Sequence, residues 1–364
     1  MEEISVGTMV GAAAFVAGIV FGATAQSANF CTMGALSDIV FMDDWRRFRA
    51  WMLAIAVAVL GSQGLAGSGL VNLDGAIYLT PRLGWAGAIL GGLMFGYGMT
   101  RAGGCGNKTL VRLGGGNLKS LVVMLVMGVF AYMTLRGLLA QPRTLLEGAT
   151  TVTLPGAQGI DALLAAATGM SRAASRWAVT AVVSGGLLVF CFKDAIFRAS
   201  GRDIAAGLII GLMVPVGWAI TGILGFDDFS PTPLASFSFV APTADGLQYV
   251  MTFTGATLNF GIAAVGGVVV GAFLAALASR SFHLEAFVDA PDMLNHIGGA
   301  ALMGVGGVLA LGCTIGQGIT GVSTLAVGSV IALLSIFAGG LLGLKSLEEG
   351  SLAGAFKALM PGQG

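Results

Sequence analysis

Cysteine is the residue type in this chain best suited to chemistry, and three of the four cysteines share one sequence setting. Each of the three follows an apolar stretch and opens a segment rich in small residues; they are Cys31 in NFCTMG, Cys105 in AGGCGNKT and Cys313 in LGCTIGQG. Cys191 lies between two phenylalanines in an apolar run, a setting typical of a buried packing cysteine. No pair has the spacing of a metal site or of a CxxC motif, so the sequence predicts neither a metal nor a cofactor.

The shared setting suits the binding of a soft anion. Gly104 and Gly312 precede two of the cysteines and allow backbone N–H groups to approach a ligand, and a helix N-terminus carries partial positive charge. A thiol is a weak donor with a polarizable sulfur, which favours a sulfur-containing anion over a hard one. The three thiols are therefore predicted to face one narrow polar path, with simple packing or a structural disulfide as the alternatives.

Two amide side chains stand close behind these cysteines. Asn107 follows Cys105 by two residues, and Gln317 follows Cys313 by four. An amide N–H₂ group can donate to the oxygens of an anion, and an amide oxygen can cap a short helix. Both roles are open for both residues.

Positive charge flanks the second cysteine. Arg101 and Lys108 could attract an anion out of the path, or they could anchor the chain at the cytoplasmic interface of a membrane. Asp38 would repel an anion, and it is therefore predicted to pair with Arg46 or Arg47.

The composition shows what must position these residues. Of the 364 residues, 56% are hydrophobic and 10% charged, the net charge is zero, and 59 are glycine. Too little charge is present for a soluble enzyme, and no basic surface is available for nucleic acid. The sequence predicts an all-α, polytopic helical membrane protein with close helix packing in the lipid bilayer. Nothing in it resembles a phosphate loop, so no ATP-driven step is expected.

A span needs about 20 apolar residues, and this criterion predicts nine spans. Their ranges are 5–25, 46–69, 83–101, 117–140, 175–196, 202–222, 256–280, 296–311 and 325–345. Four glycine-rich segments are too short to cross and are predicted to be re-entrant loops with half-helices: 29–43, 104–113, 228–250 and 313–322. Surface loops are the alternative for each, and 141–172 is predicted to be an exposed linker.

Lys and Arg give the orientation, because cytoplasmic loops carry an excess of both. With the N-terminus outside, the inner side would hold 13 of these 18 residues, namely Arg46, Arg47, Arg49, Arg101, Lys108, Arg112, Lys119, Lys193, Arg198, Arg202, Arg280, Lys345 and Lys357. The outer side would hold 5, namely Arg82, Arg136, Arg143, Arg172 and Arg176. The sequence therefore predicts an outer N-terminus, acidic at Glu2 and Glu3, and a cytoplasmic C-terminus in a bacterial inner membrane.

An internal repeat relates the two halves. Ile89–Cys105 and Ile297–Cys313 match at 7 of 17 positions, the paired cysteines among them, at an offset of 208 residues. An odd number of predicted spans separates the copies, so they must point in opposite directions across the bilayer, as in many transporters. We expect a first repeat at 1–140, a linker and connecting helix at 141–200, and an inverted second repeat at 201–364.

Three cysteine segments together resemble the YeeE/YedE family of sulfur-transport membrane proteins. They are FCTMGALSDI from Phe30, AGGCGN from Ala102 and GCTIGQG from Gly312, and the resemblance covers nearly the whole chain. It implies thiosulfate uptake through an hourglass-shaped protein in which Cys31, Cys105 and Cys313 handle the ion. It also implies a small soluble sulfur-carrier protein on the cytoplasmic side. Asn29 stands where that family often has an arginine, so a related sulfur or selenium anion remains open.

Two other functions compete with import of thiosulfate or a related sulfur anion. A membrane sulfurtransferase would pass sulfane sulfur through a cysteine persulfide, and Lys108 could supply the low thiol pKa it needs. A soft-metal channel would use Cys and Met, but the 16 methionines form no ladder, which argues against this class.

Overall fold

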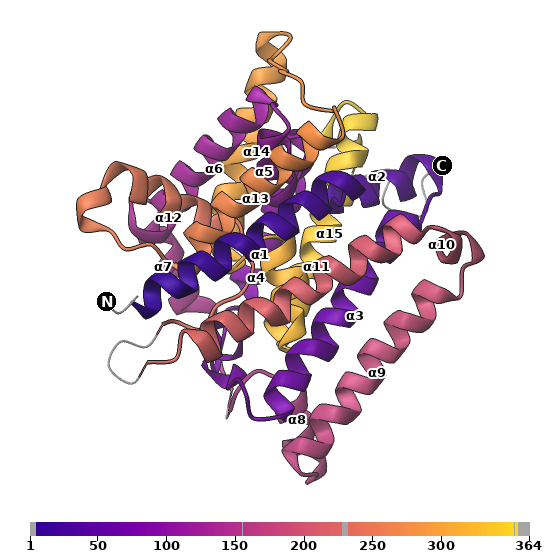
Figure 1. The fold of residues 1–364 in the computed structure, drawn as a ribbon, viewed down its shortest axis with the longest axis vertical. Coiled ribbons are helices and arrows are strands. Elements are labelled where there is room, and N and C mark those ends of the chain that lie inside the picture. The colour runs from indigo at the N-terminus through magenta and orange to yellow at the C-terminus, as the bar shows by residue number, and fades with distance from the viewer. Residues whose placement is uncertain (1–4, 155, 228–231, 353, 356–364) are drawn as a thin grey trace.

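The computed structural model describes residues 5–154, 156–227, 232–352 and 354–355. Some parts of the chain for which the sequence made predictions lie outside the described residues. They are Glu2, Glu3, Lys357 and the start of the 228–250 segment. Within the described residues the protein is almost entirely helical (Figure 1), and its one sheet pairs the two-residue strands β1 (Arg82–Leu83) and β2 (Val152–Thr153). The predicted all-α class is confirmed.

Each predicted span corresponds to a long helix. These are α1 (Val6–Ala28), α3 (Arg46–Gly67), α4 (Trp85–Arg101), α6 (Leu118–Arg136), α9 (Arg172–Phe192), α11 (Gly201–Ala219), α13 (Phe260–Ala278), α14 (Ala290–Leu309) and α15 (Val327–Glu348). In the described chain, seven helical stretches are long and apolar enough to cross a membrane, the first of them joining α1 to α2 (Thr32–Met42). Neither α4, with 17 residues, nor α14, which begins with the polar sequence APDMLNH, belongs to the seven. The exact number of spans therefore stays a prediction.

Short helices occupy all four segments predicted to be re-entrant. They are α2, α5 (Gly106–Gly114), α12 (Val240–Met251) and the helical stretch 314–323, which contains the wide π-helical turn η5 (Gly316–Gly321). The remaining short elements are α7 (Ala140–Thr150), α8 (Ile160–Thr168), α10 (Ala195–Ala199), η1 (Leu73–Gly75), η2 (Ile77–Leu79), η3 (Ile220–Leu224) and η4 (Phe253–Gly255).

The long helices pack in reciprocal pairs. Helix α1 packs on α13 while α11 packs on α3, and α4 packs on α15 while α14 packs on α6. Glycine permits the α1–α13 contact, because a Cβ on Gly22 would lie 2.1 Å from the carbonyl oxygen of Val268. Likewise, a Cβ on Gly271 would lie 2.1 Å from the carbonyl oxygen of Ile19. In a membrane, small residues allow the backbones of two helices to contact each other directly.

Replacing Gly22 with alanine should therefore destabilise the fold. The new methyl group would collide with α13 backbone, and overpacking of this kind costs about 1–3 kcal/mol. Thermal unfolding of the purified protein in detergent measures the loss. Gly185→Ala on α9 is the matched control, because a Cβ there meets no atom within 4 Å. Equal unfolding temperatures for the two variants would show that the α1–α13 contact tolerates a side chain.

The segment predicted to be an exposed linker is only partly exposed. Helix α7 has no buried residue, as predicted, but Asp161 at the start of α8 is 4% exposed. Its carboxylate lies 3.5 Å from Arg172 Nε and 3.8 Å from Arg176 Nε, and the neighbouring Ile160 N–H donates to the Leu325 carbonyl. The polar sequence indicated solvent here, whereas the Asp161 carboxylate is buried and pairs with two arginines that are themselves partly exposed.

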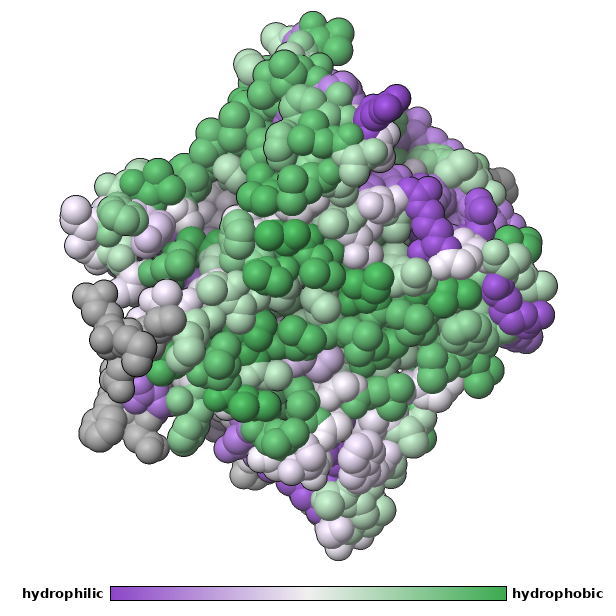
Figure 2. Space-filling model, viewed as in Figure 1, coloured by the Kyte–Doolittle hydropathy of each residue, from purple (hydrophilic) through white to green (hydrophobic). Residues whose placement is uncertain are grey.

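One face of the molecule is broadly apolar (Figure 2). Large apolar side chains are exposed along α1 and α11, including Val16, Val20, Leu212 and Val216. A soluble monomer rarely exposes so continuous an apolar surface, whereas the hydrocarbon of a bilayer covers it.

Candidate functional site

The three cysteines with the shared setting all stand at the beginning of short helices. Cys31 is the N-cap of α2, and its sulfur accepts from the Gly34 N–H at 3.4 Å. Cys313 directly precedes the 314–323 helix, and its sulfur accepts from the Gly316 N–H, also at 3.4 Å. Cys105 is the N-cap of α5 without a side-chain capping bond, so its thiol is free to point elsewhere. Each sulfur thus lies at the positive end of a helix dipole.

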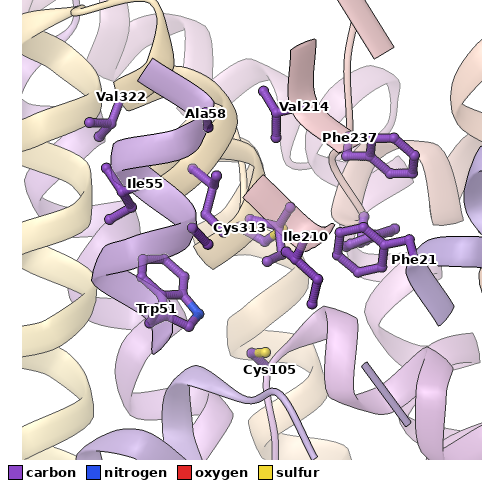
Figure 3. Packing of buried hydrophobic residues seen from close by; sticks show 14 of the residues in the cluster. Phe21, Trp51, Ile55, Ala58, Cys105, Ile210, Val214, Phe237, Cys313 and Val322 are labelled. Atoms are coloured by element: carbon purple, nitrogen blue, oxygen red, sulfur yellow. The ribbon is translucent and has the colours of Figure 1, made fainter. Parts of the chain in front are cut away.

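These helix starts meet in the buried core. The Cys31 and Cys105 thiols lie next to each other, and the Cys105 thiol also lies next to the side chain of Thr314, the residue after Cys313. All three cysteines are at most 5% exposed and belong to one packed cluster, in which Figure 3 shows Cys105 and Cys313. No disulfide forms, since all four cysteines are free thiols. Segments up to 282 residues apart in the chain (31 to 313) therefore form one site.

A cavity of about 330 Å³ leads to the Cys313 side of this site. Gly312, Tyr78 and Trp218 line it, and most of the wall is apolar. Asp245 is the charged residue in the wall. The cavity therefore gives access to the third cysteine segment without itself supplying a cation.

Cations gather next to Cys31 and the start of α2. Lys108 donates from Nζ to Asn29 Oδ1, and its charge lies near both Cys31 and Cys105. Arg47 lies against the first turn of α2, where a Cβ on Gly34 would be 2.6 Å from its Nη1.

Arg47 also forms the ion pair with Asp38 that the sequence allowed, whereas Arg46 pairs with Asp44 at 2.6 Å. Arg112 lies one turn beyond Lys108 and donates to the Gly103 carbonyl at 3.1 Å. Arg47 and Arg112 were not predicted as site residues, because neither is adjacent to a cysteine in sequence.

Arg101 is not brought to the thiols. Its guanidinium donates to Asn295 Oδ1 on α14, at the polar end of that helix. Of the two flanking cations, the structure therefore places Lys108 beside the thiols and Arg101 beside the polar start of α14.

The amide side chains of Asn107 and Gln317 both donate to backbone carbonyl groups near the cysteine segments. Asn107 donates from Nδ2 to the Phe30 carbonyl at 3.4 Å, and Gln317 donates from Nε2 to the Ala310 carbonyl. One donor of each amide thus helps to hold the cysteine segments together, and both amide oxygens are buried with no partner among the described residues. Neither oxygen therefore caps a helix within the described residues, whereas donation to an anion stays a prediction.

The two glycines that precede Cys105 and Cys313 stand where the backbone is closely approached by other atoms. A Cβ on Gly104 would lie 3.0 Å from Lys108 Cγ, and one on Gly312 would lie 3.1 Å from the Gln317 N–H nitrogen. The chain can therefore turn directly from each cysteine segment into its short helix.

Cys191 stands apart from this arrangement. Its thiol is buried and donates to the Arg49 carbonyl on α3 at 3.2 Å, which confirms a packing role. Within the described part of the chain, no cluster of His, Cys, Asp and Glu could hold a metal ion.

Fold and site together define a polytopic helical membrane protein with buried thiols at the facing ends of half-helices. Residues 27–342 match the family described as Sulphur transport, and the chain belongs to that family. Two relatives are both named thiosulfate transporter TsuA. That of Escherichia coli (strain K12) is 26% identical over 317 residues, covering 84% of this chain and 85% of its own. That of Spirochaeta thermophila is 24% identical over 329 residues, covering 84% and 89%.

Proposed function

We propose that this protein imports thiosulfate along the three buried thiols. The observation that supports it most is the meeting of three half-helix starts, where Cys31 contacts Cys105 and Cys105 contacts Thr314. Helix dipoles and neutral thiols attract the anion without a full charge to trap it. The names of both relatives support thiosulfate as the substrate.

The proposed route begins at the cavity that reaches Gly312. The ion passes Cys313, then Cys105 and Cys31, and leaves near Lys108. With the cation excess inside, this direction is inward, and the C-terminus is cytoplasmic. A small soluble sulfur carrier would collect the ion beside Lys108 and Arg112.

The proposed architecture is a pair of inverted repeats, 1–140 and 201–364. The reciprocal packing supports it, because exchanging α1 with α11 and α3 with α13 converts one observed helix pair into the other. The same holds for α4 with α14 and α6 with α15. A site between such halves near the membrane midplane is the arrangement that alternating access requires.

Uptake of labelled thiosulfate into proteoliposomes containing the purified protein tests the function. Uptake should exceed that of empty liposomes, and excess unlabelled thiosulfate should suppress it while excess sulfate should not. Selenite as a second competitor tests the selenium alternative. Uptake that sulfate suppresses as well as thiosulfate does would contradict selection by the thiols.

A sulfurtransferase is the second candidate, and the position of Lys108 favours it. An ammonium beside Cys31 would stabilise a thiolate at that residue. That thiolate would attack the sulfane sulfur of thiosulfate, the S–S bond would break, and sulfite would leave with its electron pair. Mass spectrometry of the cysteines during turnover distinguishes the two, since stoichiometric persulfide indicates transfer and intact thiols with continuing uptake indicate transport.

A further inference from the structure

Trp51 on α3 carries a buried hydrogen-bond donor that has no partner among the described residues. The side chain is 1% exposed, and its indole N–H makes no hydrogen bond. A buried indole normally finds an acceptor, because an unpaired polar group is costly to desolvate. Trp218, equally buried, donates to Ser323 Oγ at 3.4 Å, and Trp45 donates to Asp43 Oδ1 at 3.1 Å. The unpaired N–H of Trp51 therefore needs an explanation.

The ring of Trp51 lies between two of the cysteine segments. It stacks on Phe30, the residue before Cys31, with ring centroids 6.4 Å apart and planes 13° from parallel. Its far edge reaches the helical turn after Cys313, where a Cβ on Gly318 would lie 2.4 Å from the indole Cη2. Phe337 packs against a third side, with ring centroids 5.9 Å apart. These contacts fix the orientation of the ring.

The indole nitrogen lies on one edge of the Trp51 ring, and Figure 3 shows which way that edge faces. In Figure 3 this edge is turned toward Cys105, and Cys313 lies on the same side of α3. Two other buried polar atoms near the cysteines also have no partner in the described part of the chain, namely the hydroxyl of Thr32 and the amide oxygen of Asn107. Unpaired polar atoms thus follow both Cys31 and Cys105 closely in the chain, as in a site that a polar ligand completes.

We infer that the Trp51 N–H donates a hydrogen bond to an oxygen of thiosulfate as the ion passes between Cys313 and the Cys31–Cys105 pair. This inference rests on the proposed transport of thiosulfate. The two ends of the ion would then be held by different chemistry: thiols contact the terminal sulfur, and the rigid indole contacts the sulfonate group. An indole N–H is a neutral donor with no acceptor capacity, so it binds an anion without adding a trapping charge.

The test removes the N–H and keeps the ring. Trp51→Phe and a variant with benzothienylalanine at position 51 both lack the donor, and the latter keeps the bicyclic shape. Both should raise the KM for thiosulfate uptake and the Kd of the purified protein by about ten-fold, the effect expected for a lost bond to a charged group. Trp177→Phe on α9 is the control, because that ring is 49% exposed.

The possible outcomes separate this inference from the proposed function. If the native protein takes up no thiosulfate, the proposed function fails. If the native protein is active and the benzothienylalanine variant has native KM and Kd values, the inference alone is wrong. An impaired Trp51→Phe variant beside a native benzothienylalanine variant would assign Trp51 a purely packing role, which also contradicts it.

Discussion

Alanine at Cys31, Cys105 or Cys313 should lower thiosulfate uptake about ten-fold or more, whereas alanine at Cys191 should leave uptake close to native. Each of the first three thiols lies at a helix start in the common buried site, and removing one leaves a gap that the ion must cross without a partner. A loss of this size corresponds to one contact worth roughly 1.4 kcal/mol. Initial rates of uptake in proteoliposomes measure it.

Cys191 is a stringent control for this series. Its thiol is as buried as the others, so its removal tests for general packing damage. Uptake is compared at equal amounts of reconstituted protein. If Cys191→Ala loses as much uptake as Cys313→Ala, then burial, and not position in the path, governs the effect.

A membrane-impermeant thiol reagent added from outside should label Cys313 faster than Cys31 or Cys105. The cavity reaches Gly312, directly before Cys313, whereas Cys31 and Cys105 contact each other beyond Thr314. Thiosulfate should slow the labelling of Cys313 by occupying the path. Mass spectrometry of peptides after timed labelling in oriented vesicles gives the rate for each residue.

Faster labelling of Cys31 than of Cys313 would overturn the proposed orientation and the inverted repeat with it. Cys313→Ser adds a chemical test at the same position, since it keeps a donor and loses the soft sulfur. It should fold and insert normally but lose much of the uptake. Native uptake in Cys313→Ser would show that sulfur–sulfur affinity has no part in selection.

The sequence predicted the helices and the cysteine segments because both depend on local patterns. Uncharged apolar runs specify the long helices, and a glycine-rich break after each run specifies a short helix that begins at a cysteine. The sequence match that pairs Cys105 with Cys313 indicates an internal repeat, and it does so without information on helix packing. These features need no knowledge of which helix contacts which.

Features that depend on helix pairing were not predictable from the sequence. Arg47 and Trp51 belong to α3, and they reach the cysteine segments only because α3 packs beside them. Asp161 is buried because its helix pairs with the charged start of α9. Asn107 points its donor at Phe30 for the same kind of reason. No spacing in the sequence specifies these contacts.

The most direct test of thiosulfate transport uses two preparations of the ion, one labelled in the terminal sulfur and one in the central sulfur. Import of the intact ion predicts that both labels enter proteoliposomes at equal rates and are recovered inside as thiosulfate. A sulfurtransferase would deliver the terminal sulfur alone and leave the central sulfur outside as sulfite. Entry of the terminal label without the central one would contradict transport of thiosulfate along the three thiols.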